Sequence, residues 1–410
     1  MKIYISGISG TGMGPLALMA KQAGHEVCGS DLHAGAIYDE LIAAGIEVSI
    51  GEQDGSFLKK KLGEIDWFVY TSALPDDHDE LVLAREAGVK CTKRDDLTAF
   101  LVDELGLSMV AVAGTHGKTT TTAMIVWTAL ELGLPVSYIV GTTLGFANSG
   151  AYHVGDKYFV YEADEYDKNF LKFHPFVSVI TTVSYDHPDI YPTREDYIAA
   201  FSQFEKQSKN VIDDKNVAFA PERFGLAGEV RRIDAGFAAS AIKMMTPETE
   251  DDKIVEVLNR FPGVGRRFER IADGVYTDYA HHPEEIAATM QMALEQARLD
   301  GRSGVVIVYQ PHQNTRQHEV KDEYRDVFRG ATKIFWLPTY LTRENPELPV
   351  LTAEELISLL ANSKDAETIE LSQNLELRLH EYLKQGYLVL LMTAGPADAW
   401  LREKFAKDLK

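Results

Sequence analysis

Cysteine is scarce in this chain of 410 residues, which has only Cys28 and Cys91. A single pair in so long a chain is not a disulfide framework, and its spacing does not match a metal-binding motif. The sequence therefore predicts two buried free thiols and excludes a fold stabilised by disulfides or by cysteine-bound zinc.

Long hydrophobic runs are also missing. The longest apolar stretches, such as VVIVY at residues 305–309 and LVLLM at 388–392, are far too short to span a membrane. The N-terminal residues MKIYISGISGTGMG contain no cleavable signal pattern, and no fixed repeat or low-complexity tract occurs. We expect a cytoplasmic protein with no membrane partner.

Positive charge is in deficit, with 41 lysines and arginines against 62 aspartates and glutamates, a formal net charge of −21. Such a chain repels polyphosphate at long range, so no nucleic-acid partner is expected. Any phosphate ligand must be captured locally, by backbone N–H groups, a few cations and metal. Hydrophobic residues make up 45% of the chain, enough to build real cores.

Short apolar runs alternate with helical patterns along the whole chain, which predicts an α/β fold of parallel sheets. Changes of pattern divide the chain into units at residues 1–107, 108–264 and 265–410, the last boundary following a Pro-Gly pair. Ligands of such sheets bind just beyond the carboxyl ends of the strands. Polar residues at those ends are therefore the candidates for chemistry.

The segment AGTHGKTTTTAM, residues 113–124, joins a predicted strand to a predicted helix. A glycine-rich turn at a helix N-terminus offers N–H donors and the positive helix end to an anion. Lys118 adds a cation for the β- and γ-phosphates, and Thr119 offers a hydroxyl to Mg²⁺. Val112 stands where the common phosphate loop has glycine, so this loop is a shorter variant. We interpret it as a nucleotide-binding loop; the alternative is a turn that only caps a helix.

An acidic cluster, EADEYD, follows a later strand and contains Glu162, Asp164 and Glu165. Neighbouring carboxylates repel each other unless a cation lies among them, and Mg²⁺ bound to ATP oxygens would satisfy them. The segment YDHPD adds His187 after the next strand. The alternative is a solvated acidic loop without metal.

The N-terminal segment GISGTGMG, residues 7–14, is a glycine turn after the first strand. It can hold a pyrophosphate at the following helix, although its spacing departs from G-x-G-x-x-G. Asp31 ends the second strand, where such folds often bind a ribose. A tight turn without a ligand is the alternative.

The last unit places DYAHHP and QPHQNTR at predicted strand ends. Adjacent histidines on a turn point apart, so His281 and His282 are not expected to share a metal. GRRFE supplies Arg266 and Arg267, which suit a clamp on phosphate. The polar residues of the two strand-end motifs are Asp278, His281, His282, His312 and Arg316.

Taken in order, these motifs resemble the Mur ligases, which build the peptide of peptidoglycan. The resemblance covers nearly the whole chain and rests on GISGTGMG, GSD, AGTHGKTTTT, EADEYD, DHPD, GVGRRFE, DYAHHP, QPHQNTR and REN. It implies three domains: a Rossmann-like UDP-sugar domain (1–107), a central P-loop ATPase (108–264) and a Rossmann-like amino-acid domain (265–410).

The resemblance also implies a reaction. ATP and Mg²⁺ would drive the joining of an amino acid, L-alanine, to the lactyl carboxylate of UDP-N-acetylmuramate through an acyl phosphate. Lys118, Arg267 and His281 would be catalytic, with His281 or a nearby carboxylate taking the proton of the amine and Arg316 holding the carboxylate of the amino acid. The enzyme would be a monomer or a homodimer.

Individual site residues follow from the same resemblance. The sugar nucleotide and the amino acid would contact Gly10, Thr11, Gly12, Asp31, Ser72, His312 and Arg316. ATP would contact Gly114, Thr115, His116, Gly117, Lys118, Thr119, Thr120, Asp234, Arg267 and Asp278. The metal would be bound by Thr119, Glu162 and His187.

The chain departs from the family in the adenine-binding segment, AGEVRRIDAGFAASA. Val230 and Arg231 replace a histidine–asparagine pair, and Asp234 replaces an asparagine, so it can accept but not donate a hydrogen bond. The central domain is also shorter than expected, and Gln313 stands where some members have arginine.

Alternatives therefore stay open. The same chemistry could serve a ligase that recycles a murein tripeptide. The chain could instead be a UDP-sugar-binding pseudoligase without turnover. A dinucleotide-dependent oxidoreductase, suggested by the N-terminal glycines, is remote because the phosphate loop is intact.

Overall fold

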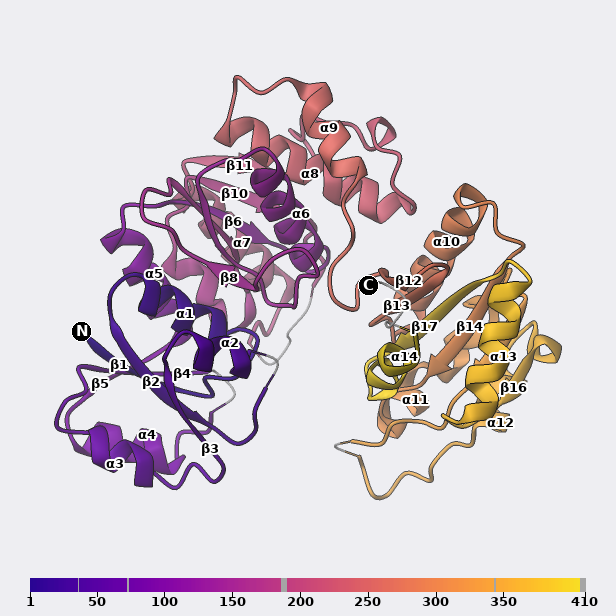
Figure 1. The fold of residues 1–410 in the computed structure, drawn as a ribbon, viewed down its shortest axis with the longest axis horizontal. Helices are drawn as coiled ribbons and strands as arrows, with labels where there is room; N and C mark the ends of the chain where they lie inside the picture. Colours follow the sequence, from indigo (N-terminus) through magenta and orange to yellow (C-terminus); the bar gives the residue numbers. More distant parts are fainter. Residues whose placement is uncertain (36, 72–73, 186–189, 343, 406–410) are drawn as a thin grey trace. The chain divides into compact units, whose positions relative to one another are not determined.

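The computed structural model describes residues 1–35, 37–71, 74–185, 190–342 and 344–405 (Figure 1). It confirms the α/β fold, with three sheets of mainly parallel strands separated by helices. The chain forms two compact units, one of Met1–Phe224 and Ile233–Phe261 and the other of Gly225–Arg232 and Pro262–Lys410. The first unit contains two sheets and the second contains one.

The first sheet has five parallel strands in the order β3-β2-β1-β4-β5. Its order reverses at β1, so the carboxyl ends of β1 and β4 flank the crevice where such sheets bind ligands. The strands are β1 (Lys2–Ser6), β2 (Glu26–Asp31), β3 (Glu47–Ile50), β4 (Trp67–Tyr70) and β5 (Lys90–Lys93). The helices are α1 (Gly14–Gln22), α2 (Tyr38–Ala43), α3 (Ser56–Lys61), α4 (Asp79–Glu86) and α5 (Arg94–Glu104).

The second sheet has six strands in the order β11-β10-β6-β9-β7-β8. Because β6 pairs in parallel with both β9 and β10, the loops that follow these three strands meet at one edge. The strands are β6 (Ser108–Ala113), β7 (Val136–Ile139), β8 (Gly150–Ala151), β9 (Tyr158–Glu162), β10 (Val177–Ile180) and β11 (Asn210–Ile212). The helices are α6 (Lys118–Glu131), α7 (Arg194–Gln207), α8 (Glu229–Met245) and α9 (Asp251–Asn259), with 3-10 turns at Tyr166–Lys172 and Pro221–Arg223.

These two sheets belong to one unit because a common hydrophobic core joins them. Leu97 and Leu101 of α5 lie in the same buried cluster as Phe170 and Phe201 of the second sheet's helices and turns. Polar contacts add to the join, since the Tyr161 hydroxyl donates to Asp95 over 2.7 Å. The carboxyl ends of both sheets can therefore build one site.

The second unit is built on a six-stranded sheet in the order β12-β13-β17-β14-β15-β16, buried on both faces. Only β12 runs antiparallel, against β13. The strands are β12 (Glu269–Ala272), β13 (Val275–Asp278), β14 (Val305–Gln310), β15 (Lys333–Trp336), β16 (Ala366–Thr368) and β17 (Leu388–Thr393). The helices are α10 (Pro283–Leu299), α11 (Asn314–Val320), α12 (Ala353–Ser358), α13 (Gln373–Lys384) and α14 (Ala397–Phe405), with 3-10 turns at Lys321–Asp326 and Ser363–Asp365.

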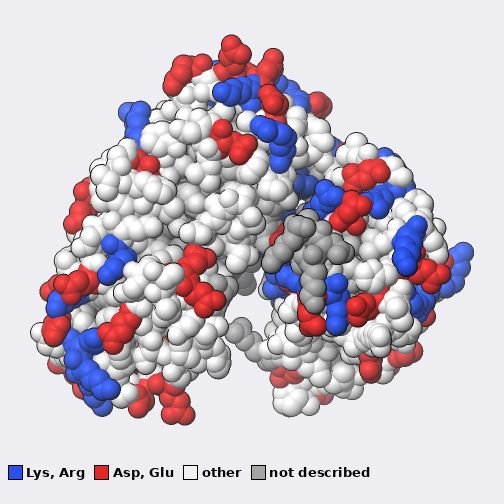
Figure 2. All heavy atoms as spheres, viewed as in Figure 1, with Lys and Arg blue, Asp and Glu red and all other residues white. Residues whose placement is uncertain are grey.

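Cys28 and Cys91 are free thiols, as predicted, but both are only partly buried. Burial nevertheless raises the pKa of the Cys28 thiol to about 11, so this thiol stays protonated at neutral pH. Within the described ranges, no helix is both long enough and apolar enough to cross a membrane. Acidic and basic side chains are interspersed on the face shown in Figure 2, with broad uncharged areas between them.

Candidate active site

The phosphate loop lies where it was predicted, between β6 and α6. Its glycines at 114 and 117 have φ angles of 137° and 81°, a backbone that other residues rarely adopt. A Cβ atom on Gly114 would lie 2.3 Å from the Thr181 hydroxyl and 2.8 Å from the Thr182 carbonyl oxygen. The loop is therefore pressed against the end of β10, and only glycine fits there.

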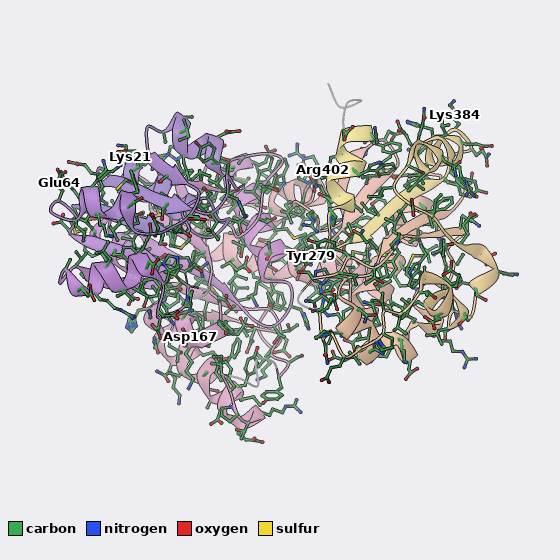
Figure 3. All side chains as sticks on the ribbon, turned by 90° about the horizontal axis from the view of Figure 1, so that it is seen from below. Lys21, Glu64, Asp167, Tyr279, Lys384 and Arg402 are labelled. Carbon is green, nitrogen blue, oxygen red and sulfur yellow. The ribbon has the colours of Figure 1, made fainter. Side chains whose placement is uncertain are left out.

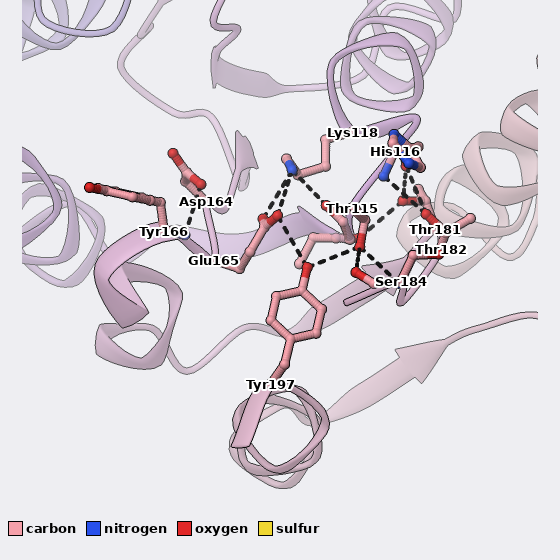
Figure 4. Close-up of polar contacts among 12 residues, drawn as sticks. Thr115, His116, Lys118, Asp164, Glu165, Tyr166, Thr181, Thr182, Ser184 and Tyr197 are labelled. Atoms are coloured by element: carbon pink, nitrogen blue, oxygen red, sulfur yellow. Dashed lines mark hydrogen bonds and ion pairs between the residues drawn. The ribbon is translucent and has the colours of Figure 1, made fainter. Parts of the chain in front are cut away.

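Hydrogen bonds to the segment after β10 hold the loop in shape (Figure 4). The Thr115 amide donates to the Thr182 carbonyl over 2.8 Å, and the His116 amide donates to the Thr182 hydroxyl over 3.0 Å. The Thr115 hydroxyl donates to the Ser184 carbonyl over 2.8 Å. In this conformation Thr115 and His116 shape the loop, while the start of α6 presents the helix end to an anion.

Lys118 is held over the loop by two kinds of contact. Its ammonium donates to the Gly114 carbonyl over 2.6 Å and pairs with Glu165 Oε2 at 3.0 Å (Figure 4). The Lys118 side chain is 16% exposed and that of Glu165 is 1% exposed. The Tyr191 hydroxyl donates to the Glu165 carbonyl over 2.6 Å, which fixes the partner in turn.

Glu165 belongs to the acidic cluster EADEYD, whose pattern gives it no role distinct from those of its neighbours. The pairing with Lys118 could not be predicted, because the two residues lie 47 positions apart and meet only through the strand order. The one sequence signal for this role is that Glu165 follows Glu162 closely at the end of β9.

The Glu162 carboxyl and the Thr119 hydroxyl lie next to each other, close to Lys118. Burial raises the pKa of the Glu162 carboxyl, while the Thr119 hydroxyl and the Lys118 charge act in the opposite direction. Glu162 Oε2 is buried and has no hydrogen-bond partner. A buried carboxylate oxygen beside a hydroxyl suits Mg²⁺, which prefers a few protein oxygens together with phosphate and water.

No group of three or more histidine, cysteine, aspartate or glutamate side chains in the described part of the chain could hold a metal by itself. Two predicted site residues, His187 and Ser72, lie outside the described residues.

Asp234 lies against the phosphate loop although it is far away in sequence. Its side chain is buried in α8, and a Cβ atom on Gly117 would lie 2.6 Å from its Oδ1. The structure therefore brings this predicted nucleotide contact to the N-terminus of α6. Thr120 lies in the first turn of the same helix.

The predicted sugar-nucleotide residues surround a cavity of about 420 Å³ at the carboxyl ends of β1, β2 and β4. Gly10, Thr11 and Gly12 line one wall, together with Asp31. The Ser9 amide donates to Asp31 over 2.8 Å, which fixes this carboxylate at the rim. Arg94 at the start of α5 also lines the cavity, although it belongs to none of the sequence motifs.

In the second unit, both carboxylate oxygens of Asp278 accept hydrogen bonds from backbone amides. Its Oδ2 accepts from the Phe268 amide over 2.6 Å and its Oδ1 from the Ala280 amide over 2.7 Å. Burial raises the pKa of this carboxyl. In this conformation Asp278 braces the turn after β13.

Arg266 and Arg267 flank the ring of Tyr279, which is labelled in Figure 3. Their guanidinium carbons lie 4.5 Å and 5.2 Å from the ring centre. Arg266 also donates to the Thr393 carbonyl over 2.9 Å, whereas Arg267 is exposed. Of the two, Arg267 is the more exposed.

His281 and His312 lie side by side, with ring centres 5.7 Å apart. His281 Nδ1 lies 2.9 Å from the Tyr279 carbonyl, which can only accept, so Nδ1 carries the hydrogen and Nε2 has the lone pair. His312 Nδ1 lies 3.2 Å from Arg316 Nη1, which can only donate. Nδ1 of His312 therefore has the lone pair, and its Nε2 carries the hydrogen. Burial lowers the pKa of both histidines, which favours the neutral form.

His282 has a different role from its neighbour, because it caps α10 together with Glu285. Glu344 holds the backbone next to the histidine pair, although no sequence motif predicted this role. It accepts from the backbone amides of Asn314, Thr315 and Thr342 over 3.0, 3.0 and 2.9 Å. It belongs to the REN motif and holds the start of α11, which carries Arg316.

Two family models match this chain. The Mur ligase catalytic-domain model matches residues 2–104, and the Mur ligase middle-domain model matches residues 112–244, together more than half of the chain. The chain belongs to the Mur ligase family. As a Mur ligase, it is an ATP-dependent ligase.

Curated relatives of this Mur ligase match along its length. The UDP-N-acetylmuramate–L-alanine ligase of Rubrobacter xylanophilus is 30% identical over 445 positions, covering 97% of this chain and 95% of the relative. That of Lactobacillus delbrueckii is 31% identical and covers 83% of this chain and 84% of the relative. The longer of these alignments exceeds the length of this chain, so the relative carries segments that this Mur ligase lacks.

Two solved structures share the fold of this Mur ligase. The UDP-N-acetylmuramate-alanine ligase of Thermotoga maritima has a TM-score of 0.77 at 22% identity, covering 98% of each chain. A murein peptide ligase from Psychrobacter arcticus has a TM-score of 0.58 at 20% identity, again covering 98% of each chain.

Proposed function

We propose that this Mur ligase joins L-alanine to the lactyl carboxylate of UDP-N-acetylmuramate, converting ATP to ADP and phosphate in peptidoglycan biosynthesis. The observation that carries the proposal is the glycine-shaped loop with Lys118 held beside Glu162 and Glu165. The relatives that carry this enzyme name, and that align over most of both chains, support the choice of substrates.

The first step joins two anions, because the lactyl carboxylate attacks the γ-phosphate of ATP. Lys118 reduces their repulsion and stabilises the charge that develops on the transferred phosphoryl group. Its contacts with the Gly114 carbonyl and Glu165 hold the ammonium at the loop before the reaction. The bond between the γ-phosphorus and the β,γ-bridging oxygen breaks, and the products of this step are an acyl phosphate and ADP.

Thr119 and Glu162 would hold Mg²⁺ through a hydroxyl and the buried oxygen that has no partner. The metal, when bound, neutralises phosphate charge. We also assign His187 to this site on the family pattern.

The second step needs an unprotonated amine, which attacks the acyl phosphate and releases phosphate. His281 accepts the proton at Nε2, the nitrogen that carries the lone pair. Arg316 binds the carboxylate of the amino acid through a charge-assisted pair, while one of its nitrogens stays on His312.

The remaining contacts orient the two nucleotides. Asp234 accepts a hydrogen bond from the adenine amino group, and the exposed Arg267 binds the phosphates of ATP. Gly10, Thr11 and Gly12 hold the pyrophosphate of the sugar nucleotide, with Asp31 at its nucleoside. Ser72 and His312 complete the substrate contacts, and the enzyme acts as a monomer or a homodimer.

Phosphate release from ATP tests the proposal when UDP-N-acetylmuramate is supplied with single amino acids or with murein tripeptide. We expect release only when both the sugar nucleotide and L-alanine are present, with a mass gain of one alanyl residue on the product. Omission of each substrate in turn is the control. Release with another amino acid alone would reject L-alanine as the substrate.

A ligase that recycles murein tripeptide is the second candidate, favoured by the fold shared with murein peptide ligases. Turnover with the tripeptide and not with L-alanine would establish it. Binding of the sugar nucleotide without any turnover would instead indicate a pseudoligase, as the changed adenine segment at Val230 and Arg231 suggests.

A further inference from the structure

The sugar-nucleotide cavity has two walls, both in the first unit. One wall is the glycine turn after β1, and the other comes from the segment after β9, with Asp164 and Tyr166. The lining also includes Asp31 and Asp95, so its carboxylates come from three parts of the chain. Arg94 is the only lysine or arginine among the described residues that line the cavity.

The guanidinium of Arg94 lies directly against the glycine turn. A Cβ atom on Gly12 would lie 2.6 Å from Arg94 Nη1, so glycine is what allows this approach. Arg94 Nε is buried and has no hydrogen-bond partner. The side chain is 27% exposed, so a ligand in the cavity can reach it.

Neighbouring groups hold Arg94 in place and leave donors free for a ligand. Its guanidinium carbon lies 5.9 Å from the centre of the Tyr161 ring, and its Nη2 lies 3.4 Å from Asp95 Oδ1. The same Asp95 oxygen accepts from the Tyr161 hydroxyl over 2.7 Å. These groups orient a cation toward the turn, as expected for recognition of an anion and not for a solvated surface arginine.

A diphosphate cannot enter a cavity lined with carboxylates, in a chain of net charge −21, without a local cation. Backbone N–H groups of a glycine turn supply partial charges only. We propose that Arg94, next to the glycine turn, binds the pyrophosphate of the sugar nucleotide together with that turn and makes the site select a nucleoside diphosphate over a nucleoside. The choice of ligand rests on the proposed function, whereas the placement of Arg94 does not.

Calorimetric titration of the full-length protein with UDP and with uridine tests this role. Arg94→Gln should weaken UDP binding about 10- to 100-fold, the loss expected for a charge-assisted hydrogen bond. It should leave uridine binding within about twofold of the unchanged protein, because uridine has no phosphate. Arg94→Lys should weaken UDP binding by an intermediate factor, since it keeps the charge and loses the planar fork.

Arg85→Gln is the matched control, because Arg85 is an exposed arginine of α4, which packs against the same sheet, and is paired with Asp76 at 3.0 Å. It should bind UDP like the unchanged protein. If Arg94→Gln weakens UDP and uridine equally, or weakens neither, the proposal is wrong. Should that variant fail to fold, Arg94→Lys decides, because unchanged UDP affinity would overturn the assignment and selective loss would support it.

Turnover separates this proposal from the proposed function. If the unchanged protein makes the alanyl product, Arg94→Gln should raise the KM for UDP-N-acetylmuramate and change the KM for ATP by less than about threefold. If the unchanged protein binds UDP without turnover, the proposed function fails and the UDP–uridine comparison still tests Arg94. If it binds no UDP, the role of Arg94 is rejected as well.

Discussion

Lys118 shows how much the role of a single residue depends on its surroundings. Its position after the glycine turn predicted a phosphate contact, and the structure adds the buried partner Glu165 that holds it there. The sequence could not supply that partner, because nothing in the spacing of the acidic cluster tells which carboxylate faces the lysine. Strand order decides it.

We expect Lys118→Ala to lower kcat about 10²- to 10³-fold, the loss typical of removing one preorganised charge from a transition state. Binding of UDP, which lacks the lactyl carboxylate, should not change, because its proposed contacts lie at the glycine turn after β1. Steady-state kinetics and titration calorimetry measure the two effects. Lys157→Ala, at an exposed lysine next to β9, is the control, and an unchanged kcat in Lys118→Ala would contradict the role.

His281 is expected to set the acidic limb of the pH profile. Burial lowers the pKa of this histidine from its ordinary value near 6.5, so the neutral base persists below that pH. Activity should therefore hold as pH falls to about 6.5 and drop only when the pH passes through the lowered pKa. Burial also destabilises the folded imidazolium, so the contribution of His281 to stability is present above pH ~6.5 and is lost as the pH falls.

His281→Gln should lower kcat about 10²- to 10⁴-fold and remove this acidic limb. The pH dependence of kcat/KM for L-alanine is the measurement. His318→Gln is a control, because its ring bonds to the Pro349 carbonyl on the exposed surface. A limb that persists in His281→Gln would assign the titration to another group.

At the scale of elements, apolar runs in the sequence mark strands that are buried on both faces, whereas the shortest edge strands leave no pattern. β6, β14 and β17 are almost wholly buried and read as continuous hydrophobic stretches. β8 has two residues and β11 has three, too few to show any period. The glycine turns could be recognised in the sequence because backbone positions with positive φ angles favour glycine.

The phosphate loop and the end of α6 offer a matched pair of glycine substitutions. Gly114 and Gly133 both have positive φ, but a Cβ atom on Gly114 meets the backbone of Thr182 at 2.8 Å whereas one on Gly133 meets nothing within 4 Å. Gly133→Ala should cost about 1–2 kcal/mol of unfolding free energy from backbone strain alone. Gly114→Ala should cost more and abolish ATP binding, because the loop must move away from β10.

Chemical unfolding and ATP titration of the two variants test this. Gly133→Ala meets only the strain of a left-handed backbone, whereas Gly114→Ala combines a φ angle of 137° with the steric contact at β10. Equal destabilisation with ATP binding retained in Gly114→Ala would mean that the loop relaxes without losing its shape.

At the scale of the whole molecule, the two compact units should unfold in separate transitions, because two-state behaviour does not extend to chains with several cores. UDP at about 100 times its Kd stabilises the unit that binds it by about 2.7 kcal/mol. We expect the midpoint of the first unit to rise by roughly 5–10 °C and that of the second to stay constant.

Scanning calorimetry with and without UDP checks this, with uridine and L-alanine as separate additions. The Arg94→Gln variant should lose most of the UDP-induced shift. A single transition whose midpoint rises when UDP is added would show that the two units unfold cooperatively.

The sequence by itself determined the α/β class and indicated several buried strands and the polar residues at their ends, because these depend on local period and residue type. Only the tertiary structure decided which strand ends lie next to one another. It brought Glu165 to Lys118, Asp234 to the phosphate loop and Arg94 to the glycine turn. Strand order sets these contacts through packing of distant segments, and no local pattern in a single chain records them.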